Sequence, residues 1–252
     1  MVEPCSKVHL NFGQKILKIS RVLKKSSTTE PTCVHLRLKE NGQQNLKQNK
    51  INKKFVYLIS PNKIRDENFY TNLALVLNTR KVSFFQLRLK KETNLNKFNI
   101  GKKIKKICKK YKVKFLINDD PLLAKKLNAD GCHLGQKDMD LIKARKILKS
   151  KIIGVTCHNS IDLAKSAIKA SADYLAFGAF YESKTKLIKY KANLKILKSV
   201  KKITSLPIVA IGGINHNNYK KLLLNKANFL AISDYIWNNK KYKPLEAIKK
   251  LK

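Results

Sequence analysis

Long apolar segments are missing from this chain. The longest apolar runs, such as residues 206–211 and 151–155, are far shorter than the roughly 20 residues that a membrane-spanning helix needs. Near the N-terminus, Lys15, Lys18 and Arg21 interrupt the apolar stretch 16–23, so no secretory signal is expected. The sequence therefore predicts a cytoplasmic protein with no membrane partner.

Cysteine pairs with metal-binding or redox spacing are also missing. The five cysteines are an odd number at wide spacing, and no two of them form a CxxC motif. This spacing argues against a disulfide scaffold and a zinc knuckle. We expect reduced thiols, three of them packed in the core.

Acidic residues are scarce. Asp and Glu number 16 against 55 Lys and Arg, which gives a formal net charge of +39. Such a charge usually suggests a nucleic-acid or anionic-membrane partner. Yet arginine, whose planar fork suits phosphate recognition, occupies only six positions. The lysine excess is what an A+T-rich coding sequence would place on a tolerant surface, so we expect non-specific polyanion affinity and no specific nucleic-acid partner.

The first part of the chain differs in composition from the rest. Residues 1–52 mix Ser, Thr, Asn, Gln and Lys and show no sustained helical or strand period. We expect a flexible N-terminal extension over 1–52, followed by one domain over 53–252. The extension is either an irregular addition or a tail for an anionic partner. With 43% hydrophobic residues, the chain can bury a real core.

From residue 55 onward, short apolar runs alternate with amphipathic stretches. Apolar residues recur with helical spacing over 100–111 and 163–168, and Pro121 suits the first turn of a helix. The expected strands are 55–59, 82–88, 112–118, 130–134, 152–156, 173–180, 207–211 and 229–233. Eight strand–helix units favour an α/β fold, a (β/α)8 TIM barrel, over an open doubly wound sheet.

Polar residues follow the carboxyl ends of these strands, where the active site of such a barrel lies. Gln86, Arg88 and Lys90 share one face of their strand and form a predicted anion clamp. One strand ends in Asn118, Asp119 and Asp120, and Asp138 lies in the loop after the next strand, so two neighbouring loops offer carboxylates for a Mg²⁺ ion that bridges diphosphate oxygens.

A second anion zone is predicted on the other side of the mouth. Its residues are Ser183 to Lys186, the Gly212–Gly213 pair and Ser233. Each signal also has a plainer reading. The clamp resembles a polar edge strand, the aspartates before Pro121 resemble a helix cap, and the glycine pair resembles a turn.

His133 and His158 each follow a cysteine, which invites a Cys–His nucleophile or a metal site. Adjacent strand residues point to opposite faces, so neither pair can act together. We expect both histidines to be structural and Glu182 to be solvated.

Five segments of the chain form a distinctive set: QLRLK (86–90), FLINDDPLLAKKLNADGCHLGQKD (115–138), IIGVTCHN (152–159), ADYLAFGAFYESKTK (172–186) and LPIVAIGGIN (206–215). Together they resemble the thiamine-phosphate synthase family. The resemblance covers about residues 55–237. It implies that a pyrimidine diphosphate, 4-amino-5-hydroxymethyl-2-methylpyrimidine diphosphate, is joined to a thiazole phosphate with release of diphosphate, and that Mg²⁺ is the cofactor.

The resemblance also implies roles for single residues. The diphosphate ligands would be Gln86, Arg88, Lys90, Asn118, Thr156 and Lys186, of which Arg88, Thr156 and Lys186 would act in catalysis. The metal ligands would be Asp119 and Asp138. The thiazole phosphate would contact Ser183, Thr185, Gly212, Gly213 and Ser233. Asp234 must then point away from the bound phosphate.

Three functions stay open on the sequence alone. The first is the synthase, acting on its two small phosphorylated substrates, either as a monomer or as a homo-oligomer. The second is a related barrel of the thiazole tautomerase kind that lacks the coupling reaction. The third is a basic nucleic-acid-binding protein.

Overall fold

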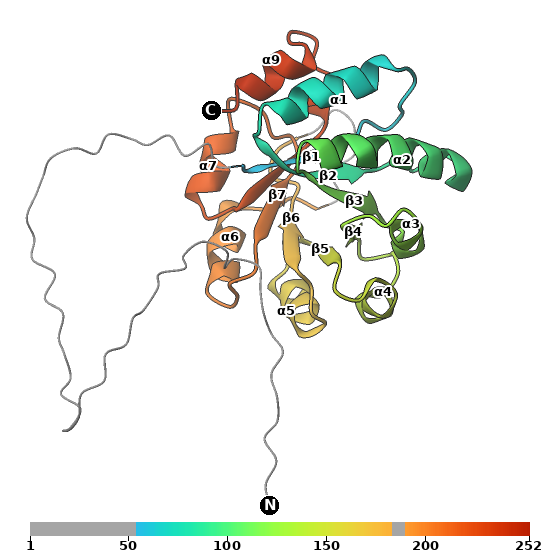
Figure 1. The fold of residues 1–252 in the computed structure, drawn as a ribbon. Coiled ribbons are helices and arrows are strands. Elements are labelled where there is room, and N and C mark those ends of the chain that lie inside the picture. The colour runs from blue at the N-terminus through green and yellow to red at the C-terminus, as the bar shows by residue number, and fades with distance from the viewer. Residues whose placement is uncertain (1–53, 183–189) are drawn as a thin grey trace, which may run out of the picture. The chain divides into compact units, whose positions relative to one another are not determined.

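The computed structural model describes residues 54–182 and 190–252. Within them, parallel strands close into a barrel in chain order (Figure 1). The strands are β1 (Val56–Ile59), β2 (Val82–Leu87), β3 (Lys114–Asn118), β4 (Gly131–Leu134), β5 (Ile152–His158), β6 (Tyr174–Phe177), β7 (Ile208–Ile211) and β8 (Phe229–Ile232). The TIM barrel is thus confirmed, and the open sheet is wrong. The expected extension, 1–52, lies outside the described residues.

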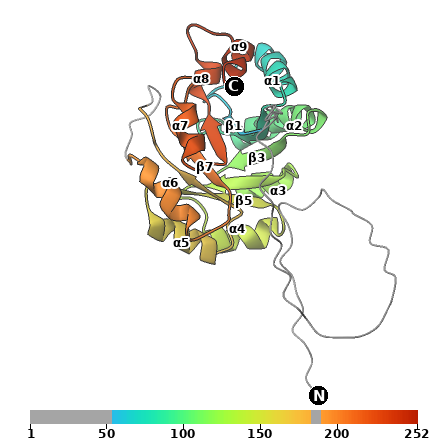
Figure 2. The same cartoon turned by 90° about the vertical axis from the view of Figure 1, so that its left-hand side faces the viewer.

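Helices surround the barrel on its outer side (Figure 2). They are α1 (Asn68–Asn78), α2 (Asn94–Lys110), α3 (Pro121–Lys126), α4 (Leu141–Leu148), α5 (Ile161–Lys169), α6 (Leu194–Lys201), α7 (Tyr219–Leu224), α8 (Asp234–Trp237) and α9 (Pro244–Lys249). Helices α2 and α5 confirm the two amphipathic stretches, and α3 begins at Pro121 as expected. None of the helices in the described ranges is long and apolar enough to cross a membrane.

The core has two layers, because successive residues of a strand point to opposite faces. The larger layer lies between strands and helices and contains the buried thiols of Cys108, Cys132 and Cys157. The smaller layer fills the barrel and includes Tyr57 and Tyr174. The expectation of three packed cysteines is therefore confirmed.

One glycine makes room for the largest ring inside the barrel. Gly154 on β5 lies beside Tyr174 on β6, and a Cβ atom at position 154 would overlap the Tyr174 ring. Tyr174 is in turn fully buried and its hydroxyl is hydrogen-bonded. The ring therefore cannot move aside without loss of those contacts.

We expect the Gly154→Ala variant to be destabilised by about 1–3 kcal/mol, the usual cost of overpacking a core. Urea unfolding measures the change. In a Tyr174→Leu background the same substitution should cost less, because the ring that it meets is gone. Equal stability of Gly154→Ala and the parent chain would show that the barrel interior is looser than described.

Candidate active site

The floor of the barrel mouth is a pair of amides from neighbouring strands. Gln86 on β2 is only 2% exposed, and its Nε2 donates to Oδ1 of Asn118 on β3 at 3.2 Å. Both side chains lie on the interior face, one layer above the apolar filling. Buried amides that are held in this way present fixed polar groups to a ligand in the mouth.

Arg88 follows β2 and is held by the loop after β1. The Ser60 hydroxyl accepts from the Arg88 backbone N–H at 2.9 Å and lies 3.3 Å from its carbonyl oxygen. The Arg88 guanidinium donates through Nη1 to Oδ1 of Asn62 at 3.0 Å. This leaves most of its N–H donors available to an anion, since a guanidinium has five.

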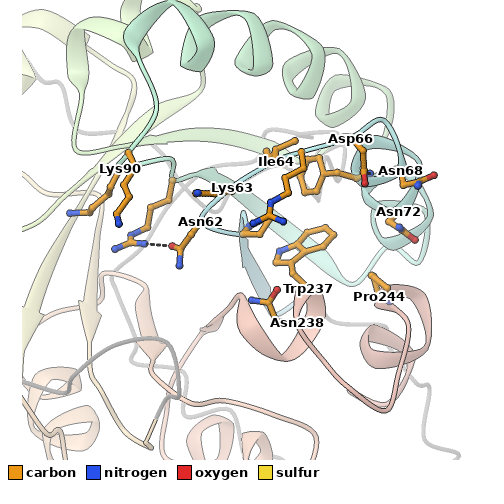
Figure 3. Close-up of a pocket in the computed structure, with 15 residues that line it drawn as sticks. Asn62, Lys63, Ile64, Asp66, Asn68, Asn72, Lys90, Trp237, Asn238 and Pro244 are labelled. Carbon is orange, nitrogen blue, oxygen red and sulfur yellow. Dashed lines mark hydrogen bonds between the residues drawn. The ribbon is translucent and has the colours of Figure 1, made fainter.

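The Arg88 side chain lines a pocket of about 900 Å³ beside the barrel mouth (Figure 3). The pocket lies between the loops after β1 and β2 and the helices α1 and α8. Its cationic side chains are Lys63, Arg65, Arg88, Lys90 and Lys91, against one carboxylate, Asp66. Its charge and size suit a phosphorylated ligand.

Two carboxyl groups face each other across the ends of β3 and β4. Asp119 hydrogen-bonds Asp138 and pairs with Lys90, whose Nζ lies 2.9 Å from Asp119 Oδ2. Asp138 also accepts from the Gly135 backbone N–H at 2.6 Å. Burial raises the pKa of Asp119, but the hydrogen bonds from Asp138 and Lys90 outweigh it and lower that pKa below its ordinary value.

Burial and the hydrogen bond to Asp119 raise the pKa of Asp138. Two carboxylates this close repel each other when both are charged, so positive charge between them is favoured. A divalent ion can supply that charge, and Mg²⁺ usually takes one or two carboxylates together with substrate oxygens. No group of three or more His, Cys, Asp and Glu side chains in 54–182 and 190–252 could hold a metal. The donor set therefore fits Mg²⁺ held partly by substrate.

The two adjacent aspartates after β3 have different tasks. Asp120 caps α3, because its Oδ1 accepts from the Leu123 backbone N–H at 2.8 Å. Asp119 has a positive φ of 65°, a conformation that Asp adopts more readily than most residues, and this turns its carboxylate toward Asp138. Asp120 is thus the helix cap, whereas Asp119 lies at the barrel mouth.

Thr156 on β5 ends a hydrogen-bonded chain that runs through the barrel interior. Its Oγ1 lies 2.8 Å from Nε2 of His133, whose Nδ1 lies 2.8 Å from the Tyr174 hydroxyl. Burial lowers the pKa of His133 to about 4, so the imidazole is neutral near pH 7. The Cys132 thiol packs in the outer core instead, as the alternation of strand residues predicts.

The glycines after β7 are explained by close packing. Gly212 and Gly213 have φ of 107° and 57°, and a Cβ atom on either would overlap the segment that follows β6, residues 179–182. Tyr181 donates its backbone N–H to the Gly212 carbonyl at 3.2 Å. The pair is therefore both a tight turn and the platform for the loop after β6.

Ser233 precedes α8, and its hydroxyl donates to the Ser60 carbonyl at 3.0 Å. The Asp234 carboxylate accepts from the side chain of Asn238 at 2.8 Å. Asp234 thus has a partner one turn along the helix. Three more predicted site residues, Ser183, Thr185 and Lys186, lie outside the described residues.

The sequence reasoning missed Ser60 and Asn62. Both follow β1, so the same search of strand ends would have found them. It also gave His133 a structural role only, because the strand pattern says which face a residue occupies and not which hydroxyl it meets there.

Comparison with known proteins gives one consistent result. A family model described as thiamine monophosphate synthase matches residues 56–236. The thiamine-phosphate synthase of Pelagibacter ubique is 84% identical over 207 residues, which cover 82% of this chain and all of that protein. The enzyme of the same name from Nitrosomonas eutropha is 37% identical over 73% of this chain and 86% of its own length.

A solved structure agrees with the sequence matches. The thiamine phosphate pyrophosphorylase from Pyrococcus furiosus superposes with a TM-score of 0.68 at 26% identity, over 79% of this chain and 94% of that chain. The comparisons therefore favour the synthase over the tautomerase and nucleic-acid alternatives.

Proposed function

The chain belongs to the thiamine monophosphate synthase family, and we propose that its barrel mouth holds the diphosphate and the Mg²⁺ of the family's coupling reaction. The carboxylate pair beside Lys90 supports this proposal most strongly, because two carboxyl groups in contact next to basic residues are the donors that a Mg²⁺ ion bound to an anion needs. The substrates are 4-amino-5-hydroxymethyl-2-methylpyrimidine diphosphate and a thiazole phosphate. Action in the cytoplasm stays a prediction.

The reaction breaks the bond between the pyrimidine methylene carbon and a diphosphate oxygen. The bonding electrons leave with the diphosphate, and the ring amino group stabilises the resulting carbocation. The thiazole nitrogen then supplies the electron pair of the new C–N bond. This route needs no protein nucleophile, so the work of the chain is to stabilise the leaving charge.

The described residues suit that task. The proposed diphosphate ligands are Gln86, Arg88, Lys90, Asn118 and Thr156, together with Lys186 of the loop after β6. Asp119 and Asp138 would hold Mg²⁺, which neutralises charge on the diphosphate oxygens when it is bound. Lys90 has an additional function, because its ion pair with Asp119 keeps that carboxylate ionised for the metal.

The thiazole phosphate is proposed to lie at the second zone. Backbone N–H groups near Gly212 and Gly213 and the turn at Ser233 would contact it, with Ser183 and Thr185. The two zones are neighbours on the closed barrel and do not lie on opposite sides, because only β1 separates β8 from β2. Ser60 after β1 contacts both Ser233 and Arg88. Such proximity lets both substrates bind with the reacting carbon and nitrogen close together.

Binding of inorganic diphosphate, the second product, tests the proposal without turnover. Calorimetry should detect binding that strengthens with Mg²⁺. We expect Lys90→Ala to weaken it about tenfold, since a hydrogen bond to a charged group contributes about 1.5–3 kcal/mol. Lys165→Ala removes the same charge from an exposed position on α5 and should leave binding unchanged. Equal losses in both variants would mean that only the overall charge attracts the anion.

A further inference from the structure

A chain of three hydrogen bonds crosses the barrel interior and ends at Thr156. The Tyr57 hydroxyl lies 2.8 Å from the Tyr174 hydroxyl, which lies 2.8 Å from His133 Nδ1. His133 Nε2 then lies 2.8 Å from Thr156 Oγ1. Tyr57 and Tyr174 are 2% and 3% exposed, and burial raises the pKa of both phenols, so they keep their protons. The hydrogen-bonded series therefore consists of neutral donors and acceptors only.

The direction in which these three hydrogen bonds point follows from the number of protons that the four side chains carry. If Thr156 donated to Nε2, then Nδ1–H would donate to Tyr174, and Tyr174 would donate to Tyr57. The Tyr57 proton would then have no acceptor, because within the described ranges Tyr174 is the only hydrogen-bond partner of the Tyr57 hydroxyl. An unpaired buried donor costs about 1–3 kcal/mol.

The opposite direction gives the protons of Tyr57, Tyr174 and His133 an acceptor each. Tyr57 donates to Tyr174, Tyr174 donates to Nδ1, and Nε2–H donates to Thr156 Oγ1. The Thr156 hydroxyl proton is then free to point out of the barrel, into the mouth. Each hydrogen bond also polarises the next, which strengthens the final donor.

We propose that His133 is a positioning residue whose Nε2–H donates to Thr156 Oγ1 and so directs the Thr156 hydroxyl proton toward the leaving diphosphate. This inference rests on the proposed function for one point, the contact between Thr156 and the diphosphate. It adds a reason why that hydroxyl donates and does not accept. A donor fixed in advance stabilises the developing charge without reorganisation during the reaction.

Two amide substitutions at His133 separate positioning from packing. The Gln amide nitrogen reaches about as far as Nε2, whereas the Asn amide nitrogen reaches only about as far as Nδ1. We expect His133→Asn to lower kcat by about 10- to 100-fold, because the contact to Thr156 is lost. His133→Gln should recover most of that loss. Equal losses would mean that His133 serves packing alone, and the inference would fail.

A double-mutant cycle with Thr156→Val connects the effect to the hydroxyl. Valine keeps the shape of threonine, so the single variant tests the diphosphate contact itself. If His133 acts through Thr156, then His133→Asn should lower kcat much less in the Thr156→Val background. Full additivity would overturn the inference and leave the proposed function intact. Near-normal turnover by Thr156→Val would instead overturn the diphosphate role of Thr156.

The tautomer of His133 can be measured without any activity. In ¹⁵N-labelled protein, the imidazole shifts of a neutral histidine distinguish Nε2–H from Nδ1–H. The five histidines of the chain are few enough to identify the His133 signals by their loss in His133→Gln. We expect the Nε2–H tautomer near pH 7. The Nδ1–H tautomer would reverse the chain and overturn the inference, whatever the kinetics show.

Discussion

Replacement of Arg88 by alanine is expected to lower kcat/KM by about 10²–10³-fold, the usual cost of one preorganised donor at a developing negative charge. Arg88 is suited to this part because Ser60 holds its backbone and Asn62 holds one edge of its guanidinium. The remaining donors face the cationic pocket beside the mouth. Steady-state kinetics with both substrates measures the effect.

Two further variants make the Arg88 result specific. Arg88→Lys keeps the charge but loses the planar fork, so it should recover only part of the activity. Arg80→Ala removes an exposed arginine just before β2, at the opposite end of the strand, and should have almost no effect. Near-normal turnover by Arg88→Ala in a folded protein would refute the clamp.

Replacement of Asp119 by asparagine should raise the Mg²⁺ concentration for half-maximal activity by at least about tenfold. Loss of an outer hydrogen-bond partner of a metal ligand already costs about 10–100-fold in affinity, and a lost ligand should cost no less. Asn also tolerates the positive φ of 65° at this position, so the substitution removes charge without adding strain. Activity measured against Mg²⁺ concentration tests the expectation.

The neighbouring aspartate supplies a matched control. The Asp120 side chain caps α3, and Asn caps a helix as well as Asp does. Asp120→Asn should therefore leave the Mg²⁺ dependence unchanged. If Asp119→Asn behaved in the same way, Asp119 would not be a metal ligand.

The alternation of strands and helices could be predicted from the sequence, because the spacing of apolar residues and the length of each apolar segment determine it. All eight strands lie within about three residues of the expected ranges. The largest difference is β6, which ends at Phe177 and not at residue 180, because the chain turns there to pass over Gly212 and Gly213. Nothing in the local pattern of apolar residues records that distant contact.

The candidate site was predictable only in part. The alternation of strand residues separates Gln86, in the barrel interior, from Leu87, in the outer core. The position of Asp119 after a strand predicted its place at the barrel mouth, while its role there stays a prediction. Which of two adjacent aspartates caps a helix depends on backbone φ, which the sequence does not give. Likewise, the contact between His133 and Thr156 depends on the register of β4 with β5.

Formation of thiamine phosphate from the two phosphorylated precursors, with Mg²⁺ and with EDTA, tests the central claim most directly. The purified full chain should make product with Mg²⁺, lose that activity in EDTA and regain it when excess Mg²⁺ is added. Product formed equally well in EDTA would contradict the metal role of Asp119 and Asp138. A folded barrel that binds diphosphate yet forms no product under either condition would contradict the coupling reaction itself.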